Sequence, residues 1–76
     1  MLRDLIEYIA LQLVDDVDAV SVSERVRGDR TVITLHVHES DMGRVIGREG
    51  RIANAMRTLL RSAGASSDRH VVLEVR

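Results

Sequence analysis

Two glycines three residues apart, Gly47 and Gly50, lie between two short stretches that each have the residue spacing of a helix. Glycine has no Cβ atom, so it can adopt backbone conformations that end one helix sharply and begin the next. The pattern predicts two helices joined by a tight turn. It also predicts that the backbone amides of residues 50–52 are free at the start of the second helix.

Arginine side chains surround the predicted turn, at positions 44, 48 and 51. Free amides and the positive end of a helix dipole attract anions, and Arg44, Arg48 and Arg51 add full charges at the same place. A phosphodiester backbone is the anion that this combination favours. The alternative interpretation is a plain helix cap beside a solvated arginine face.

Charge is unevenly distributed along the chain. The net charge is −1, but residues 1–40 hold four arginines and eight acidic residues, whereas residues 41–76 hold seven arginines and four acidic residues. We therefore expect the positive patch to coincide with the glycine turn. All eleven basic residues are arginine. This excludes a Walker-type phosphate loop, because that loop requires a lysine after its second glycine.

The length of 76 residues predicts a single domain over residues 1–76, with a small core and modest stability. The chain has no cysteine, and no apolar run approaches the roughly 20 residues needed to span a bilayer. Asp4 and Glu7 interrupt the first apolar stretch, which argues against a signal peptide. We expect a cytoplasmic protein.

Hydrophobic periodicity predicts six elements in the order α-β-β-α-α-β. Residues 2–14 have the spacing of an amphipathic helix, and residues 19–27 and 31–38 alternate as two strands of a hairpin. Ser40 or Asp41 is expected to cap a short helix that ends at Gly47, and the next helix begins near Arg51. A last strand covers residues 70–76. The apolar stripe of the first helix comprises Leu2, Leu5, Ile6, Ile9 and Leu13, and that of the helix after the turn comprises Ile52, Met56, Leu59, Leu60 and Ala63.

These elements predict an α+β fold in which three helices cover one face of a three-stranded mixed sheet. The last strand is expected to lie beside the first strand and parallel to it, because two helices carry the chain out and back after the hairpin. Residues 64–68 are expected to form a polar loop. Tyr8 and Leu11 lie off the stripe of the first helix and are expected to form a small exposed apolar patch.

Histidines and acidic residues offer weaker candidates for a site. His36 and His38 have the spacing of one strand face, but His70 is not expected beside them, so we predict no metal site. The acidic residues between positions 15 and 18 lack the oxygen spacing of an EF-hand. Neither Tyr8 nor any serine has a base partner at a recognisable spacing, so we expect no catalytic residue and no cofactor.

The glycine turn, placed between two helices of an α-β-β-α-α-β chain, resembles that of a KH domain in the bacterial, type II arrangement. The resemblance covers essentially the whole chain. Specifically, the chain resembles small stand-alone KH proteins of the KhpA type, in which Ser-Asp-x-Gly-Arg-x-Ile-Gly-x-x-Gly is typical. Here that stretch runs from Ser40 to Gly50 as SDMGRVIGREG. The single aromatic residue, Tyr8, argues against folds that stack bases on rings.

The resemblance implies binding of about four single-stranded nucleotides, with the turn clamping their backbone, and no catalysis. It further implies a role as an RNA chaperone, dimerisation, and pairing with a larger KH-containing protein of the KhpB or Jag type linked to cell shape and cell-wall organisation. Ile46 and Ile52 would supply an apolar floor, with residues 64–70 and the last strand as the opposite wall. The residues expected to bind RNA are Arg44, Ile46, Gly47, Arg48, Glu49, Gly50, Arg51, Ile52, Asn54 and Arg57.

Glu49 departs from the family pattern, which usually has a basic or polar residue at this position. Its charge is expected to weaken phosphate binding, although it could instead hold Arg48 or Arg51 in place. Two other functions stay open, a dimerising protein-interaction module with weak or vestigial nucleic-acid binding, and a site for single-stranded DNA or a small phosphate ligand. Replacing Gly47 and Gly50 with aspartate is expected to abolish RNA binding and to leave the fold intact.

Overall fold

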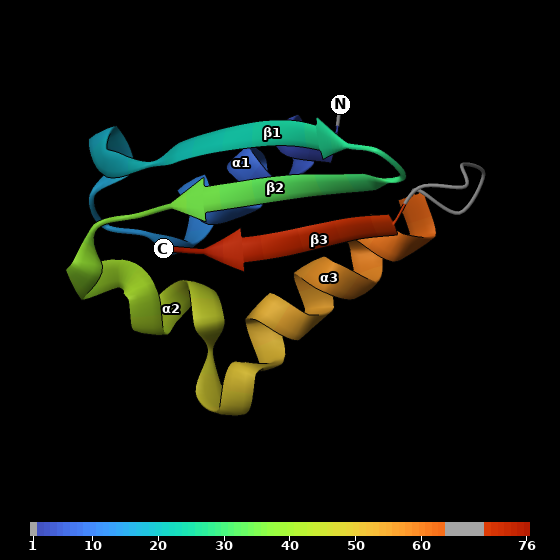
Figure 1. Cartoon of the computed structure of the whole chain (residues 1–76). Coiled ribbons are helices and arrows are strands. Elements are labelled where there is room, and N and C mark those ends of the chain that lie inside the picture. Colours follow the sequence, from blue (N-terminus) through green and yellow to red (C-terminus); the bar gives the residue numbers. More distant parts are fainter. Residues whose placement is uncertain (1, 64–69) are drawn as a thin grey trace.

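The computed structural model describes residues 2–63 and 70–76. In these residues the helices cover one face of a three-stranded sheet and leave the other face open (Figure 1). The predicted order α-β-β-α-α-β is confirmed. The main elements are α1 (Leu2–Leu13), β1 (Ser21–Arg27), β2 (Arg30–His36), α2 (Met42–Ile46), α3 (Arg51–Ala63) and β3 (His70–Val75), and three 3-10 turns are η1 (Val17–Ala19), η2 (Glu39–Asp41) and η3 (Arg48–Gly50).

β1 and β2 form the predicted antiparallel hairpin. The register pairs Ser21 with His36 and Arg27 with Arg30, so the connecting turn is two residues long. Gly28, the first residue of this turn, has a φ angle of 60°. Glycine adopts this angle at no steric cost because it has no Cβ atom.

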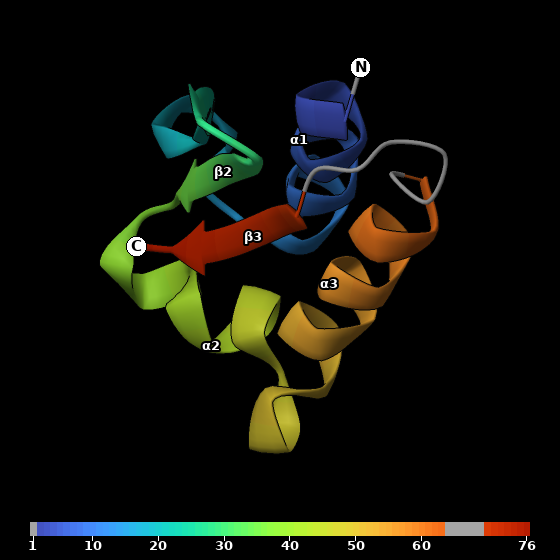
Figure 2. The same ribbon diagram turned by 45° about the vertical axis from the view of Figure 1, so that its right-hand side comes forward.

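The sheet has the strand order β1-β2-β3, so the prediction that the last strand lies beside the first was wrong. β3 runs parallel to β2 and pairs from Arg30 with His70 to Leu35 with Val75. The physical reason is the path of the chain. α2 and α3 carry it from the end of β2 back to the start of β2, and α3 packs on β3, so the free edge of β2 is the nearest place for β3 (Figure 2). β3 is therefore an edge strand next to α3.

The core lies between the sheet and the helices. In α1, Ile6 is fully buried as predicted, but Ala10 and, just after the helix, Val14 also belong to the core, whereas Leu5 is half-buried outside it. The buried residues of α1 and the residue that follows it thus have a spacing of four residues. Tyr8 and Leu11 are exposed as predicted, with 64% and 37% of their surfaces accessible.

The buried face of α3 is rotated relative to the prediction. Met56 and Leu60 are buried as expected, but Ala53 is buried too, and Leu59 is 47% exposed. Among the described residues, α3 contacts the sheet mainly along the edge strand β3, so its contact stripe is narrow and excludes Leu59. The predicted loop at 64–68 and the side chain of Ala63 lie outside the described residues. Over the described ranges, no helix is long and apolar enough to cross a membrane.

Candidate nucleic-acid interface

The predicted turn joins α2 to α3 and reverses the chain within four residues (Figure 2). The Gly47 amide donates to the Gly43 carbonyl at 2.9 Å and closes α2, and the Gly50 amide donates to the Gly47 carbonyl at 3.1 Å. Glu49 and Gly50 both have left-handed backbones, with φ angles of 58° and 76°. Because these two successive residues are left-handed, α3 starts directly after the turn and its axis points in a different direction from that of α2.

The two glycines have different roles. A Cβ atom at Gly47 would lie 2.9 Å from the backbone nitrogen of Ile52 and 2.8 Å from its Cγ1 atom. At Gly50 a Cβ atom would meet only the side-chain amide nitrogen of Asn54, at 3.8 Å. Gly47 is therefore required for packing, whereas Gly50 faces open space. The expectation that aspartate at both positions leaves the fold intact was wrong for Gly47, because the backbone nitrogen and the side chain of Ile52 occupy the space.

The backbone amides available to an anion differ from those predicted. The Gly50 amide donates to the Gly47 carbonyl, and the Arg51 amide donates to the Arg48 carbonyl, so neither is free. In a four-residue turn closed in this way, the amides of the two inner residues have no acceptor within the turn. These are the amides of Arg48 and Glu49, which the sequence did not predict as donors, and the predicted free amide of Ile52 stays a prediction.

The three arginines around the turn are all exposed, but they are not equally available. Within the described ranges, Arg48 forms no ion pair. A guanidinium nitrogen of Arg51 lies 3.9 Å from a carboxylate oxygen of Glu49, and this solvent-exposed contact contributes little. Arg44 instead pairs with Asp15 at 2.8 Å, so its charge is directed toward the end of α1.

Asn54 and Arg57 connect the turn to the edge strand. Arg57 donates to the side-chain oxygen of Asn54 at 3.0 Å and to the backbone carbonyl of Leu73 in β3 at 3.4 Å. Asn54 in turn lies beneath Gly50, one helical turn away. The polar face of α3 thus forms a continuous surface from the turn to β3.

Ile46 and Ile52 flank the turn and are half-buried. Both pack against the core cluster, so they fix the position of the turn relative to the sheet. Whether they also form an apolar floor for a ligand stays a prediction.

Asp41 is the one buried charged residue among those described, with 1% of its surface accessible. Its two carboxylate oxygens accept hydrogen bonds from the backbone amides of Asp15 and Asp16, both at 3.1 Å. Asp41 is the N-cap residue of α2, in agreement with the prediction of Ser40 or Asp41, but its side chain makes no hydrogen bond to that helix. The Asp41 carboxylate binds the distant amides that follow α1 and not the amides at the start of α2.

Hydrogen bonds from the amides of Asp16 and Asp15 hold the pKa of the Asp41 carboxyl below its ordinary value, against the opposing effect of burial. The positive charges of Arg44 and His38 act in the same direction. Asp41 therefore stays ionised and ties the end of α1 to the start of α2, which is the helix that leads into the turn.

The histidines do not share a strand face as their spacing suggested. His36 ends β2, whereas His38 lies beyond the strand, where its ring accepts a hydrogen bond from the Ser40 amide at 3.1 Å. His70 starts β3, opposite Arg30 at the other end of β2. Within 2–63 and 70–76, the structure contains no group of three or more potential metal ligands.

The order of elements, the parallel pairing of the last strand with β2, and a GxxG turn between α2 and α3 define a KH domain of the type II arrangement. The family model described as KhpA/KhpB, KH domain, matches residues 3–75. The chain belongs to this family.

Relatives of similar length match almost the whole chain. The RNA-binding protein KhpA of Aquifex aeolicus is 45% identical over 75 residues, which cover 97% of this chain and 94% of the relative. The RNA-binding protein KhpA of Clostridium acetobutylicum is also 45% identical over 75 residues, covering 97% and 99% of the two chains. The RNA-binding protein KhpA of Bacillus subtilis is 40% identical over 74 residues, covering 97% and 91%. No solved structure matches.

Proposed function

We propose that this chain is a single KH domain over residues 1–76 that binds single-stranded RNA and holds its phosphate backbone at the Gly47–Gly50 turn. The observation that carries the proposal is the turn itself, in which the amides of Arg48 and Glu49 have no acceptor within the turn. The side chain of Arg48 is exposed beside them. Backbone donors next to a guanidinium group suit a phosphate oxygen. The names of the relatives support RNA as the ligand.

From the turn, the RNA would follow the polar face of α3 toward the edge strand. Along β3, the backbone N–H and C=O groups of successive residues point alternately toward β2 and away from it. The amides of His70 and Arg76 donate to the hairpin, so the backbone groups of Leu73 point to the outer edge of the sheet. The carbonyl of Leu73 receives Arg57 there. Free edge groups and amide side chains can read the edges of unstacked bases without aromatic rings.

The full set of residues proposed to contact RNA retains the prediction from the sequence, with altered roles. Arg44 reaches phosphate only by leaving Asp15, and Gly47 acts by shaping the turn rather than by contact. No catalytic step is part of the proposal, and the chemical consequence of binding would be to keep RNA single-stranded, as an RNA chaperone does. The set is Arg44, Ile46, Gly47, Arg48, Glu49, Gly50, Arg51, Ile52, Asn54 and Arg57.

Gly50 offers the sharpest test of the proposal, because aspartate and asparagine have nearly the same shape and both tolerate left-handed backbones. Gly50→Asp adds a negative charge where a phosphate would lie, whereas Gly50→Asn adds none. We expect Gly50→Asp to bind single-stranded RNA at least roughly tenfold more weakly than Gly50→Asn at low salt. Fluorescence anisotropy with labelled oligonucleotides measures this ratio, and equal affinities of the two variants would contradict the proposal.

Glu49 is expected to limit the affinity. Its carboxylate lies in the turn and makes only a weak contact of 3.9 Å with Arg51. We expect Glu49→Lys to bind RNA about three- to tenfold more tightly at low salt, with a smaller gain at high salt, because the gain is electrostatic. Glu49→Gln should lie between the two. Weaker binding by Glu49→Gln would show instead that Glu49 positions Arg51.

A second candidate function is a protein-interaction module, favoured by the exposed apolar side chains of Tyr8 and Leu11 on α1. Such a surface would serve a homodimer or a pair with a larger KH-containing protein. Dimerisation would place two turns on one assembly and raise the avidity for RNA. Sedimentation equilibrium of the wild type and of Tyr8→Glu/Leu11→Glu tests it. A wild-type protein that stays monomeric at all concentrations would exclude the homodimer.

A further inference from the structure

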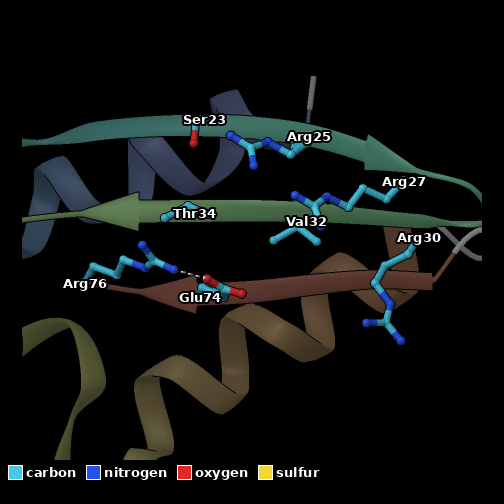
Figure 3. Close-up of a pocket in the computed structure, with 8 residues that line it drawn as sticks. All are labelled: Ser23, Arg25, Arg27, Arg30, Val32, Thr34, Glu74 and Arg76. Carbon is cyan, nitrogen blue, oxygen red and sulfur yellow. Dashed lines mark hydrogen bonds and ion pairs between the residues drawn. The ribbon is translucent and has the colours of Figure 1, made fainter.

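The face of the sheet that the helices leave open carries a concentration of arginines. Side chains alternate along each strand, so those of Arg25 and Arg27 in β1, Arg30 in β2, and Arg76 just beyond β3 lie on the open face (Figure 3). They line a shallow hollow of about 400 Å³. We refer to these four residues as the arginine face. Three of them come from the half of the chain that is acidic overall.

The charge of the arginine face is largely unbalanced. Among the described residues, Glu74 is the one acidic residue that lines the hollow, and it pairs with Arg76 at 3.0 Å (Figure 3). With the residues that the structure describes, Arg25, Arg27 and Arg30 form no ion pair. Arg27 and Arg30 are direct partners in the antiparallel register, and like charges in that position destabilise a sheet. An anionic ligand would remove this repulsion.

The remaining lining of the hollow indicates which anion fits. Ser23, Val32 and Thr34 form its floor, and none of the lining residues is aromatic. Bases therefore find no ring to stack on, and an apolar protein surface would bury little beyond Val32. Guanidinium groups bind phosphate oxygens through paired N–H donors. Several of them on one open surface suit a chain of phosphates.

The edge strand β3 separates the arginine face from the proposed RNA surface. At the outer edge of β3, the Leu73 carbonyl receives Arg57 from α3, and on the open face of the sheet Glu74 and Arg76 line the hollow. In the part of the chain that the structure describes, no further strand pairs with the outer edge of β3, so an extended ligand can pass around this edge (Figure 1).

We propose that the arginine face binds the phosphodiester backbone of the same single-stranded RNA, beyond the nucleotides held at the Gly47–Gly50 turn. The inference rests on the proposed function. It implies that affinity rises with RNA length after the turn is filled, and that the added affinity comes from phosphate contacts without base preference.

The test compares the wild type with Arg25→Gln/Arg27→Gln/Arg30→Gln on fluorescein-labelled oligouridines of about 5 and about 15 nucleotides. The glutamine variant is expected to bind the longer RNA at least roughly tenfold more weakly and the shorter RNA within about twofold of the wild type. For the longer RNA, the slope of log affinity against log salt concentration should become less steep by about 2 in this variant. Each phosphate contact on a single strand contributes roughly 0.7 to that slope, and three arginines are removed.

Two further variants separate local from general effects. Arg25→Lys/Arg27→Lys/Arg30→Lys keeps the charge and should retain most of the affinity for the longer RNA. Gln12→Glu/Val17→Glu changes two exposed residues, in α1 and shortly after it, and lowers the net charge by two units at a distance from the hollow. This control should stay within about twofold of the wild type. An equal loss in the control, or no gain in wild-type affinity from the shorter to the longer RNA, would overturn the inference.

Gly50→Asp distinguishes this inference from the proposed function. If Gly50→Asp loses both RNAs and the glutamine variant loses neither, the turn is the site and the arginine face is not. If Gly50→Asp keeps its affinity for both RNAs and only the glutamine variant loses affinity for the longer RNA, RNA binds at the arginine face and the proposed role of the turn is contradicted. A wild type that binds neither RNA overturns both. Self-association that the glutamine variant loses, with unchanged RNA affinity, would assign the face to a second copy of the chain and contradict RNA binding there.

Discussion

Gly47→Ala is expected to lower the melting temperature by about 10–20 °C and to weaken RNA binding with it. With φ of 79° and ψ of 171°, Gly47 occupies a backbone region that residues with a Cβ atom essentially avoid, at a cost of about 1–3 kcal/mol. The new methyl group would also lie 2.9 Å from the Ile52 nitrogen, and such overpacking costs about 1–3 kcal/mol more. Thermal unfolding followed by circular dichroism measures the effect.

Two glycines nearby provide matched controls for Gly47→Ala. A Cβ atom at Gly43, inside α2, would meet nothing within 4 Å, so Gly43→Ala should keep or slightly raise the melting temperature. Gly50→Ala meets no close atom but takes on the left-handed strain, so its loss should be smaller than that of Gly47→Ala. A melting temperature of Gly47→Ala equal to that of Gly43→Ala would show that the close contact with Ile52 does not exist in solution.

Local patterns made much of the fold and the position of the turn predictable from the sequence. The alternation around Gly28 and the spacing after Arg51 are properties of neighbouring residues, and the structure places a hairpin and a helix there. The turn at Gly47 and Gly50 was likewise found from two residue types at a fixed spacing. The prediction of free amides was wrong for Gly50 and Arg51, because spacing does not reveal which carbonyl each amide finds.

Features that depend on distant segments were not predictable in this way. Asp41 binds amides 25 and 26 residues earlier in the chain, and nothing in its local sequence distinguishes it from an ordinary helix cap. The position of β3 depends on which edge of the hairpin the helices reach. The arginine face was not predictable for the same reason, since strand register brings Arg27, Arg30 and Arg76 onto one surface from separate segments.

Asp41→Ala is expected to destabilise the fold strongly, with a fall in melting temperature of more than about 5 °C. The carboxylate is buried, and its removal leaves the amides of Asp15 and Asp16 without their acceptors. Asp41→Asn should also be destabilised, because its amide group offers one acceptor and directs N–H donors toward the second amide. Glu39→Gln removes an exposed carboxylate two residues away and serves as the control, with little expected change.

The dependence of stability on pH separates the charge of Asp41 from its shape. Because the folded state lowers the pKa of this carboxyl below 3.8, the unfolded chain binds its proton first as the pH falls. The stabilisation by ionised Asp41 is therefore complete well above pH 3.8 and is lost as the pH falls below that value through the folded pKa. The difference in melting temperature between the wild type and Asp41→Asn should be constant near neutral pH and shrink in this acidic range. A difference that stays unchanged under acid would mean that the two amides bind the shape of the side chain and not its charge.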